Sequence, residues 1–231
     1  MSELVSYLLE EKTAVVTMDD GKANALSEAM IDALAKAIER AQDEASAVVL
    51  LGRPGRFCAG FDLRTMMAGP DAAKALLERG SELLLKLFAC RVPLVIGCTG
   101  HALAGGALVV LTGDVRLGAA GAYRIGLNEV QIGLPVPVLA MELARARLTP
   151  RELTRATLLA QTYEPEEARE AGYLDAVVAA ADVRTRALAE AERLAGLARN
   201  AFEATKERLR GASIAHIRAT FEHDVKALLG G

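Results

Sequence analysis

One stretch of the chain limits the possible folds more than any other, because a short apolar run is followed by glycines that begin a second apolar run. Residues 93–99 (PLVIGCT) have the length and composition of a buried strand, and residues 107–111 (ALVVL) follow Gly105 and Gly106. This order predicts a strand, a tight turn and a buried helix. A glycine at a helix start leaves backbone N–H groups free, and the helix dipole favours negative charge there. The segment can therefore hold an oxyanion.

A second glycine turn, residues 52–63 (GRPGRFCAGFDL), lies directly after the apolar run 47–51. If the fold brings the two turns together, one N–H group from each can hold the oxygen of a developing enolate. Glu129 is flanked by apolar residues and has no obvious cationic partner nearby in the sequence. Taken singly, glycine pairs and glutamates are more often ordinary turns and solvated side chains, so the functional interpretation depends on their combination.

Three segments occur in an order that resembles the crotonase, or enoyl-CoA hydratase/isomerase, superfamily: FCAGFDL (57–63), HALAGGALVVLTGDVRL (101–117) and IGLNEVQIGL (125–134). The similarity extends from KANALS (22–27) to the helical C-terminus. It implies an α/β fold, the ClpP-like crotonase spiral of ββα turns. It also implies an acyl-CoA thioester as substrate, with coenzyme A as part of that substrate and no separate cofactor.

The resemblance assigns catalytic roles to Phe61, Gly105 and Glu129. The backbone N–H groups of Phe61 and Gly105 would bind the thioester oxygen, and Glu129 would be the base. Hydratases of this superfamily use two glutamates, and Leu108 stands at the position of the first of them. Leucine there, with IGLNE at the second position, is most similar to the mitochondrial-type Δ3,Δ2-enoyl-CoA isomerases. The expected reaction is the shift of a 3-enoyl-CoA to a 2-enoyl-CoA, with one glutamate carrying a proton from C2 to C4.

Other reactions of the superfamily stay open at this point. They are hydration, thioester hydrolysis and decarboxylation of an acyl-CoA. The spacing also departs from the hydratase pattern, because Glu129 stands one residue farther from Asp114 than the matching residue does in typical hydratases. An alternative from a different functional class is a protein that binds acyl-CoA without catalysing a reaction. The retained glutamate argues against a binder, which has no need of a buried carboxylate.

The resemblance also indicates that the backbone of two segments grips the adenine and pantetheine parts of coenzyme A. The predicted substrate-binding residues are Lys22, Ala23, Ala25, Ala59, Gly60, Asp62, Leu63 and Asn128. Lys22, Arg53 and Arg56 are candidates to face the phosphates, with solvated surface cations as an equally good interpretation. Asp62 is expected to cap the helix after the turn rather than to perform chemistry.

Length and composition set the remaining expectations. A chain of 231 residues suits one large domain, and we expect a spiral core in residues 1–180 and a helical oligomerisation region in residues 181–231, forming a homotrimer or hexamer as in the superfamily. The net charge of −3 argues against a nucleic-acid partner. His216 and His223 would lie two turns apart, roughly 10 Å along a helix, so no metal site is expected.

The expected location is the cytoplasm. The three cysteines lie beside apolar runs, which is typical of reduced, buried thiols. The N-terminus lacks the pattern of a signal or transit peptide, and no apolar run is long enough to cross a membrane.

Periodicity predicts the regular elements. Strands are expected at residues 7–9, 13–18, 47–51, 93–99 and 174–178. Helices are expected after the N-cap Ser27 and at Pro70, Pro150 and Pro165, and residues 183–209 and 213–229 are expected to be helical.

Overall fold

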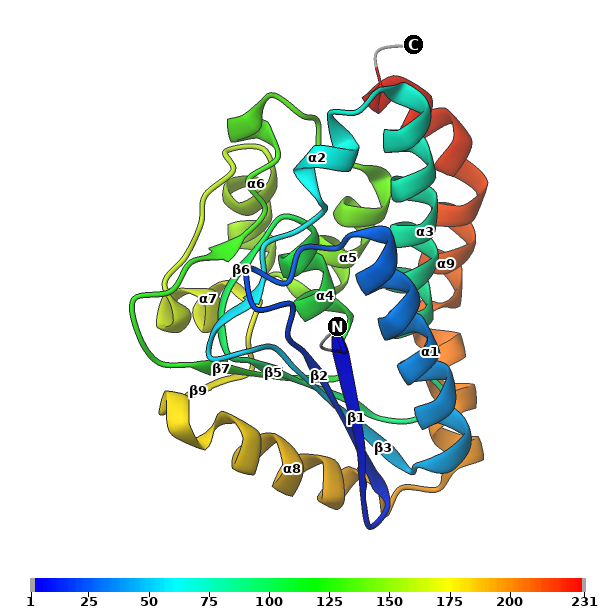
Figure 1. Cartoon of the computed structure of the whole chain (residues 1–231), viewed down its shortest axis with the longest axis vertical. Helices are drawn as coiled ribbons and strands as arrows, with labels where there is room; N and C mark the ends of the chain where they lie inside the picture. The colour runs from blue at the N-terminus through cyan, green and yellow to red at the C-terminus, as the bar shows by residue number, and fades with distance from the viewer. Residues whose placement is uncertain (1–2, 230–231) are drawn as a thin grey trace.

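The computed structural model describes residues 3–229 and shows an α/β fold (Figure 1). The strands are β1 (Val5–Glu10), β2 (Thr13–Met18), β3 (Ala47–Leu51), β4 (Gly55–Cys58), β5 (Leu94–Cys98), β6 (Gly100–Leu103), β7 (Val115–Ala119), β8 (Ile125–Gly126) and β9 (Ala176–Val178). The helices are α1 (Glu28–Glu44), α2 (Leu63–Met66), α3 (Pro70–Phe88), α4 (Gly105–Thr112), α5 (Val138–Arg147), α6 (Pro150–Thr157), α7 (Pro165–Ala171), α8 (Val183–Leu194) and α9 (Arg199–Leu228), with short 3-10 turns η1 (Val130–Ile132) and η2 (Ala180–Asp182).

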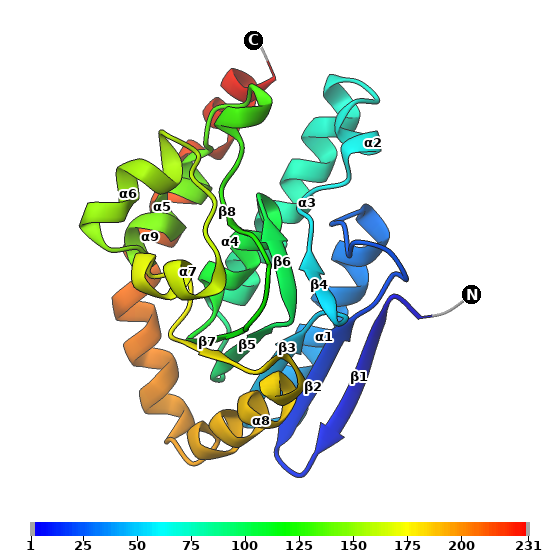
Figure 2. The ribbon, with the colours of Figure 1, turned by 90° about the vertical axis from the view of Figure 1, so that its left-hand side faces the viewer.

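The strands form two sheets. The larger has the order β1-β2-β3-β5-β7-β9, with β1 and β2 antiparallel and the other pairs parallel. The smaller is a parallel sheet of order β4-β6-β8, which stands above the larger one (Figure 2). Successive turns of the chain therefore place one strand in each sheet, and the small sheet gathers segments that lie far apart in sequence.

Strand β3 shows how the large sheet is buried on both faces. Its alternate residues point to opposite sides, as the two-residue repeat of a strand requires. Val48 and Leu50 belong to the main core under α1, whereas Val49 and Leu51 pack in a second cluster with α8. Helix α8 accordingly lies along the opposite face of the sheet from α1 (Figure 1). Burial on both faces explains why the strand has a continuous apolar sequence.

The predicted start of α1 is confirmed. The Ser27 hydroxyl accepts a hydrogen bond from Met30 N at 3.3 Å, as an N-cap residue does. The buried residues of this helix recur at helical spacing on one face, among them Ile31, Leu34 and Ile38.

The C-terminal helices differ from the sequence prediction. The break lies at residues 195–198, between α8 and α9, and not at residues 210–212. Gly211, which falls in the predicted gap between the two helical ranges, lies inside α9. Lys206 and Arg210 on this helix bind the half-buried carboxylate of Asp114, so long-range contacts stabilise the part of α9 that precedes Gly211.

Three expectations from composition can be compared with the structure. Cys58, Cys90 and Cys98 are buried free thiols, and burial raises the pKa of Cys58 and Cys98 to about 12. Across residues 3–229, no helix is both long and apolar enough to cross a membrane. In the same range, His, Cys, Asp and Glu side chains form no group of three or more that could hold a metal ion.

Gly106 is required because α4 packs closely on β4. A Cβ atom at this position would lie 2.0 Å from the carbonyl oxygen of Cys58. Gly106→Ala is expected to lower the free energy of unfolding by about 1–3 kcal/mol, since backbone must move to relieve the contact. Gly211→Ala is the control, because a Cβ there meets nothing within 4 Å and alanine favours a helix. Chemical denaturation of both variants tests this, and equal stabilities would contradict the close approach.

Candidate active site

The candidate site is built where three parallel strands end. In the small sheet, Cys58 pairs with Ala102 and Leu103 pairs with Gly126, so β4, β6 and β8 end at the same edge. The segments that follow these strands, residues 59–61, 104–105 and 127–129, therefore emerge side by side. Both glycine turns and the candidate base lie in these three segments.

The two glycine turns meet, as the oxyanion hypothesis requires. A Cβ built on Gly60 would lie 3.2 Å from Gly105 N, and one built on Gly105 would lie 3.2 Å from the ring carbon Cδ2 of Phe61. Gly60 has a φ of +93°, which glycine adopts without strain. Ala104, just before Gly105, has a φ of +47°, an unusual value for a residue with a side chain. Each of the two turns therefore contains one residue with a positive φ next to its candidate N–H donor.

Phe61 N–H and Gly105 N–H are the two candidate oxyanion donors. Neither group donates a hydrogen bond to any residue in the described range. Gly105 is the first residue of α4, where backbone N–H groups have no intrahelical acceptor. The Phe61 ring packs toward α3, because a Cβ on Gly80 would lie 2.1 Å from its Cε1 atom. The ring is therefore packed between its own turn and α3.

A mainly apolar cavity of about 220 Å³ opens beside these turns. Of the residues singled out from the sequence, Ala59, Phe61, Leu63, Leu108, Asn128 and Glu129 line it. The structure thus brings the candidate base and one oxyanion turn to the same cavity. The other walls come from residues that the sequence patterns did not single out, including Leu103, Leu134, Pro137 and Leu228.

Glu129 is buried in this cavity and unpaired. Its exposed fraction is 8%, and it directly precedes η1, so its backbone carbonyl accepts from Ile132 N and Leu134 N at 3.0 Å each. Its Oε2 atom is buried without a hydrogen-bond partner among the described residues, as is Asn128 Oδ1. Burial raises the pKa of Glu129 above its ordinary value of 4.5. A desolvated carboxylate with a raised pKa is a stronger base than a solvated one.

Leu108 lies on the wall of the same cavity. It follows Gly105 by one helical turn in α4 and is 3% exposed. Within residues 3–229, Glu129 is the one acidic side chain that lines the cavity. The site therefore offers one carboxylate and, at Leu108, a surface that cannot transfer a proton.

The predicted coenzyme A segments lie together. Ala59 N donates to Ala23 O at 3.0 Å, Leu26 N to Gly60 O at 2.8 Å, and Asp62 N to Leu26 O at 3.2 Å. Residues 22–26 therefore run alongside the first glycine turn. The Lys22 side chain is exposed, and Ala23 and Ala25 are half-buried.

The other charged residues singled out from the sequence differ in their contacts. They are Arg53, Arg56 and Asp62. Arg53 donates to Lys22 O at 2.9 Å and lies 3.5 Å from Asp19, so part of its charge is used within the protein. Arg56 is exposed. Asp62 occupies the N-cap position of α2, but its carboxylate accepts from the Thr65 hydroxyl at 2.9 Å and makes no backbone cap bond.

Asn24 is a supporting residue that sequence reasoning did not identify. It is buried with a φ of +53°, and its amide donates to Met18 O, Arg56 O and Phe57 O. It thereby ties residues 22–26 to β4. Its place within KANALS was the available signal, since asparagine tolerates left-handed backbone and bonds to nearby main chain.

His101 has a structural explanation. Its Nδ1 atom accepts from Arg124 N at 3.0 Å, and its ring stands edge-on to Tyr123 at 5.4 Å between centroids. Burial and the nearby Arg56 and Arg124 lower its pKa. It is not among the cavity-lining residues.

Comparison with known proteins finds consistent similarities. A family model described as enoyl-CoA hydratase/isomerase matches residues 9–228. Enoyl-CoA delta isomerase 1, mitochondrial, from Homo sapiens is 30% identical over 218 residues, covering 92% of this chain and 72% of that protein.

Solved structures agree over nearly the whole chain. An enoyl-CoA hydratase/isomerase family protein from Pseudomonas syringae superposes with a TM-score of 0.95 at 37% identity, covering 98% of both chains. An enoyl-CoA hydratase from Mycobacterium ulcerans superposes with a TM-score of 0.93 at 39% identity, covering 98% of this chain and 100% of that one. Similarity therefore extends to proteins described as isomerases and to proteins described as hydratases.

Proposed function

Because the chain belongs to the enoyl-CoA hydratase/isomerase family and has its crotonase fold, we propose that it shifts the double bond of a 3-enoyl-CoA to give a 2-enoyl-CoA. The observation that carries this proposal is the single carboxylate of the cavity: Glu129 is buried and unpaired, with Leu108 on the wall of the same cavity. The similar proteins include both a delta isomerase and hydratases, so the choice between the two reactions rests on the cavity.

The first step is removal of a proton from C2 of the bound thioester. The enolate that results is unstable unless its oxygen is held by donors already in place. In the proposed reaction Phe61 N–H and Gly105 N–H hold this oxygen, each donor contributing roughly 3–4 kcal/mol of transition-state stabilisation. The backbone supplies both donors, so they need no reorganisation during the reaction.

The second step returns the proton at C4 of the dienolate. Glu129 is the proposed carrier in both steps, and the apolar walls of the cavity keep water from competing for the proton. Addition of water to a double bond is better served by two acid–base groups, one to orient the water and one to protonate carbon. Leu108 can do neither, so the cavity favours isomerisation over hydration.

The proposed substrate is bound through coenzyme A. Residues 22–26 run alongside residues 59–63, and Ala59, Phe61 and Leu63 line the cavity. This arrangement supports the proposal that the two segments grip the adenine and pantetheine parts. Lys22 and Arg56 are exposed there and are proposed to face the phosphates. A homotrimer or hexamer is likewise proposed from the family.

An assay with 3-hexenoyl-CoA tests the proposed function. Formation of the conjugated thioester is followed by absorbance, and the product is identified by mass spectrometry. The wild-type protein is expected to form 2-hexenoyl-CoA, with Glu129→Ala as the inactive reference. A wild-type protein as inactive as Glu129→Ala would refute the proposal.

The pH dependence of the reaction follows from the burial of Glu129. The base must be a carboxylate, and burial raises its pKa above 4.5, so activity should fall as the pH drops through this raised value. The acidic midpoint of kcat/KM is therefore expected above the pKa of a solvated glutamate. Initial rates measured across the acidic range check this. A midpoint at or below 4.5 would show that the catalytic group is not this desolvated carboxylate.

A further inference from the structure

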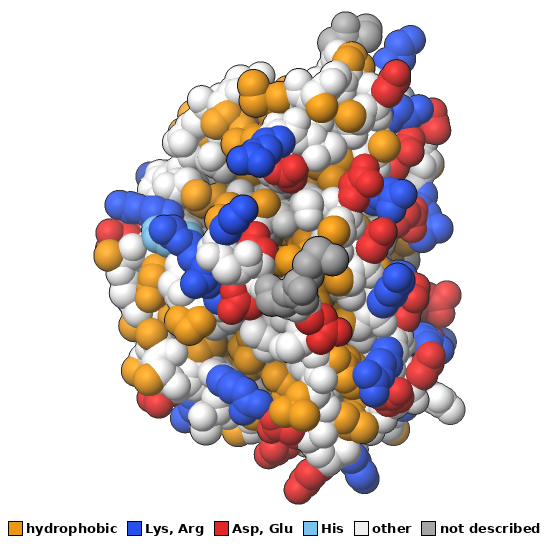
Figure 3. Space-filling view, in the orientation of Figure 1, with side chains coloured by type: hydrophobic (Ala, Val, Ile, Leu, Met, Phe, Trp, Pro, Cys, Tyr) orange, Lys and Arg blue, Asp and Glu red, His pale blue; other side chains and the backbone are white. Residues whose placement is uncertain are grey.

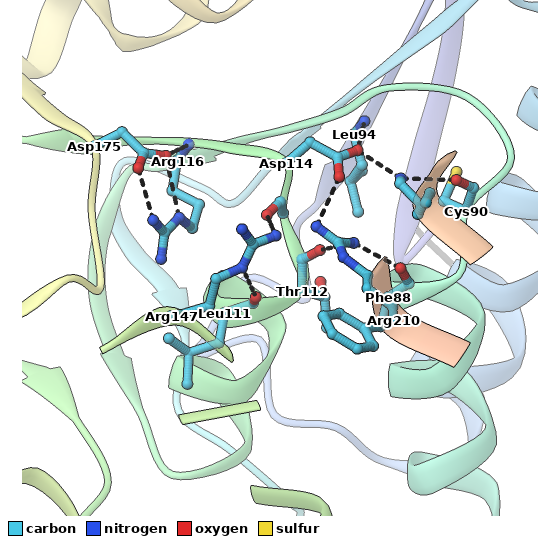
Figure 4. A network of polar contacts seen from close by, with 12 residues as sticks. Phe88, Cys90, Leu94, Leu111, Thr112, Asp114, Arg116, Arg147, Asp175 and Arg210 are labelled. Carbon is cyan, nitrogen blue, oxygen red and sulfur yellow. Dashed lines mark hydrogen bonds and ion pairs between the residues drawn. The ribbon is translucent and has the colours of Figure 1, made fainter. Parts of the chain in front are cut away.

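The far end of α4, opposite Gly105, is enclosed by cationic side chains (Figure 4). Arg147 of α5 donates from Nε to Leu111 O at 3.2 Å and from its terminal nitrogen to Gly113 O. Arg210 of α9 donates to Thr112 O at 3.3 Å and to Phe88 O at 2.6 Å. The last carbonyl groups of the helix are thus bound by two guanidinium groups from different elements.

The cations of this cluster exceed the carboxylates. Asp114 is shared between Lys206 Nζ at 2.6 Å and Arg210 at 2.8 Å, and Asp175 pairs with Arg116 at 2.6 Å. Arg147 has no carboxylate oxygen within 4.0 Å among residues 3–229, so its charge is met by carbonyl dipoles. Counting these six side chains, four cations face two carboxylates.

Arg147 keeps its charge although it is half-buried. Burial and the neighbouring guanidinium groups of Arg210 and Arg116 lower its pKa to about 10, which still leaves it protonated at neutral pH. On the same helix, Arg145 is exposed and pairs with Glu142 at 2.7 Å. The two arginines therefore differ in surroundings while sharing one helix.

Helix α4 connects this cluster to the cavity. Its eight residues span about 12 Å, with Gly105 N–H at one end and the bound carbonyls at the other. The helix is buried along its whole length, so solvent screens the field poorly. Cations at the C-terminal end offset the negative pole of the helix dipole and add a positive potential at the N-terminal end.

We propose that Arg147, assisted by Arg210, is a positioning residue for the oxyanion hole: it fixes α4 and raises the positive potential at Gly105 N–H. The inference rests on the proposed function, since it assumes that Gly105 binds the thioester oxygen. At an effective dielectric constant near 20 and a separation of about 12 Å, one charge changes the pKa of the oxyanion by about half to one pH unit. The corresponding loss in kcat on removing the charge is about 3- to 10-fold.

The test titrates a ligand oxygen directly. Acetoacetyl-CoA is bound to the protein in a Glu129→Gln background, so that this carboxylate does not titrate, and the pKa of its enolate is followed by near-ultraviolet absorbance. The enolate pKa on this reference protein is expected below that of free acetoacetyl-CoA. Arg147→Met and Arg147→Gln are each expected to raise it by about half to one pH unit. Arg147→Lys keeps the charge and is expected to restore most of the lowering, and Arg145→Met is the matched control.

The outcomes separate the inference from the proposed function. If Arg147→Gln leaves the enolate pKa at the reference value while lowering thermal stability, Arg147 is a structural cap and the inference is overturned. If the reference protein itself binds acetoacetyl-CoA without lowering the enolate pKa, the oxyanion hole of the proposed function fails. Arg147→Gln can still donate to a helix carbonyl, so it decides the question even if Arg147→Met does not fold.

Discussion

Glu129→Gln is expected to lower kcat for isomerisation of 3-hexenoyl-CoA by about 10²- to 10⁴-fold, the contribution usual for a positioned general base. The amide has nearly the same shape as the carboxylate but cannot accept the C2 proton. Since the cavity offers no second acidic side chain within residues 3–229, no neighbour can replace it. Substrate binding should stay within a few-fold of wild type, because neither oxyanion donor is changed. Steady-state kinetics and calorimetric binding measure the two effects.

The control for this variant is Glu222→Gln. Glu222 is an exposed residue of α9 that does not line the cavity, and its replacement should leave kcat unchanged. A Glu129→Gln protein that keeps more than a tenth of wild-type kcat would show that another group moves the proton. The single-carboxylate mechanism would then be wrong.

The second large effect is expected on stability. Asp114→Ala should lower the free energy of unfolding by about 3–5 kcal/mol, because it leaves the ammonium group of Lys206 and the guanidinium group of Arg210 buried without a counter-charge. The change also removes the acceptor of Leu94 N, bound at 2.8 Å at the start of β5. Denaturant unfolding measures the loss.

Asp32→Ala is the matched control for Asp114→Ala. Asp32 pairs with Arg79 at 3.0 Å, and both side chains are about half exposed. The pair joins α1 to α3, on a surface where acidic and basic side chains are interspersed (Figure 3). An ion pair exposed to solvent in this way contributes about 0–1 kcal/mol. Adding Lys206→Met to Asp114→Ala should recover part of the loss, since it removes one of the uncompensated charges. Equal losses for Asp114→Ala and Asp32→Ala would contradict the account.

Much of the fold could be predicted from the sequence because local signals and the global fold agree. The apolar run 47–51, the N-cap Ser27 and the glycines before α4 each specify their element through local backbone chemistry. The predicted break at residues 210–212 is wrong. The gap contains Gly211, which lowers helix propensity, but Lys206 and Arg210 on the same helix make long-range contacts with Asp114 and the helix continues. Propensity is local, and tertiary contacts can override it.

The residues of the candidate site likewise form two groups, those that the sequence motifs identify and those that only the structure shows. The motifs identify Phe61, Leu108 and Glu129, and the structure places all three on one cavity. The roles of these residues stay predictions until they are tested. Leu228 could not be identified, because it reaches the cavity from the end of α9 and no local pattern records that approach. Arg147 was missed for a similar reason, since its partners are backbone carbonyl groups of Leu111 and Gly113.

The most direct test of the single-carboxylate account compares two products formed by one enzyme. Wild-type protein is supplied separately with 3-hexenoyl-CoA and 2-hexenoyl-CoA, and the thioesters are separated and identified by mass. The account predicts that 3-hexenoyl-CoA becomes 2-hexenoyl-CoA, while 2-hexenoyl-CoA gains water far more slowly than the double bond moves. Rapid formation of 3-hydroxyhexanoyl-CoA from 2-hexenoyl-CoA, with little conversion of the 3-enoyl substrate, would contradict it.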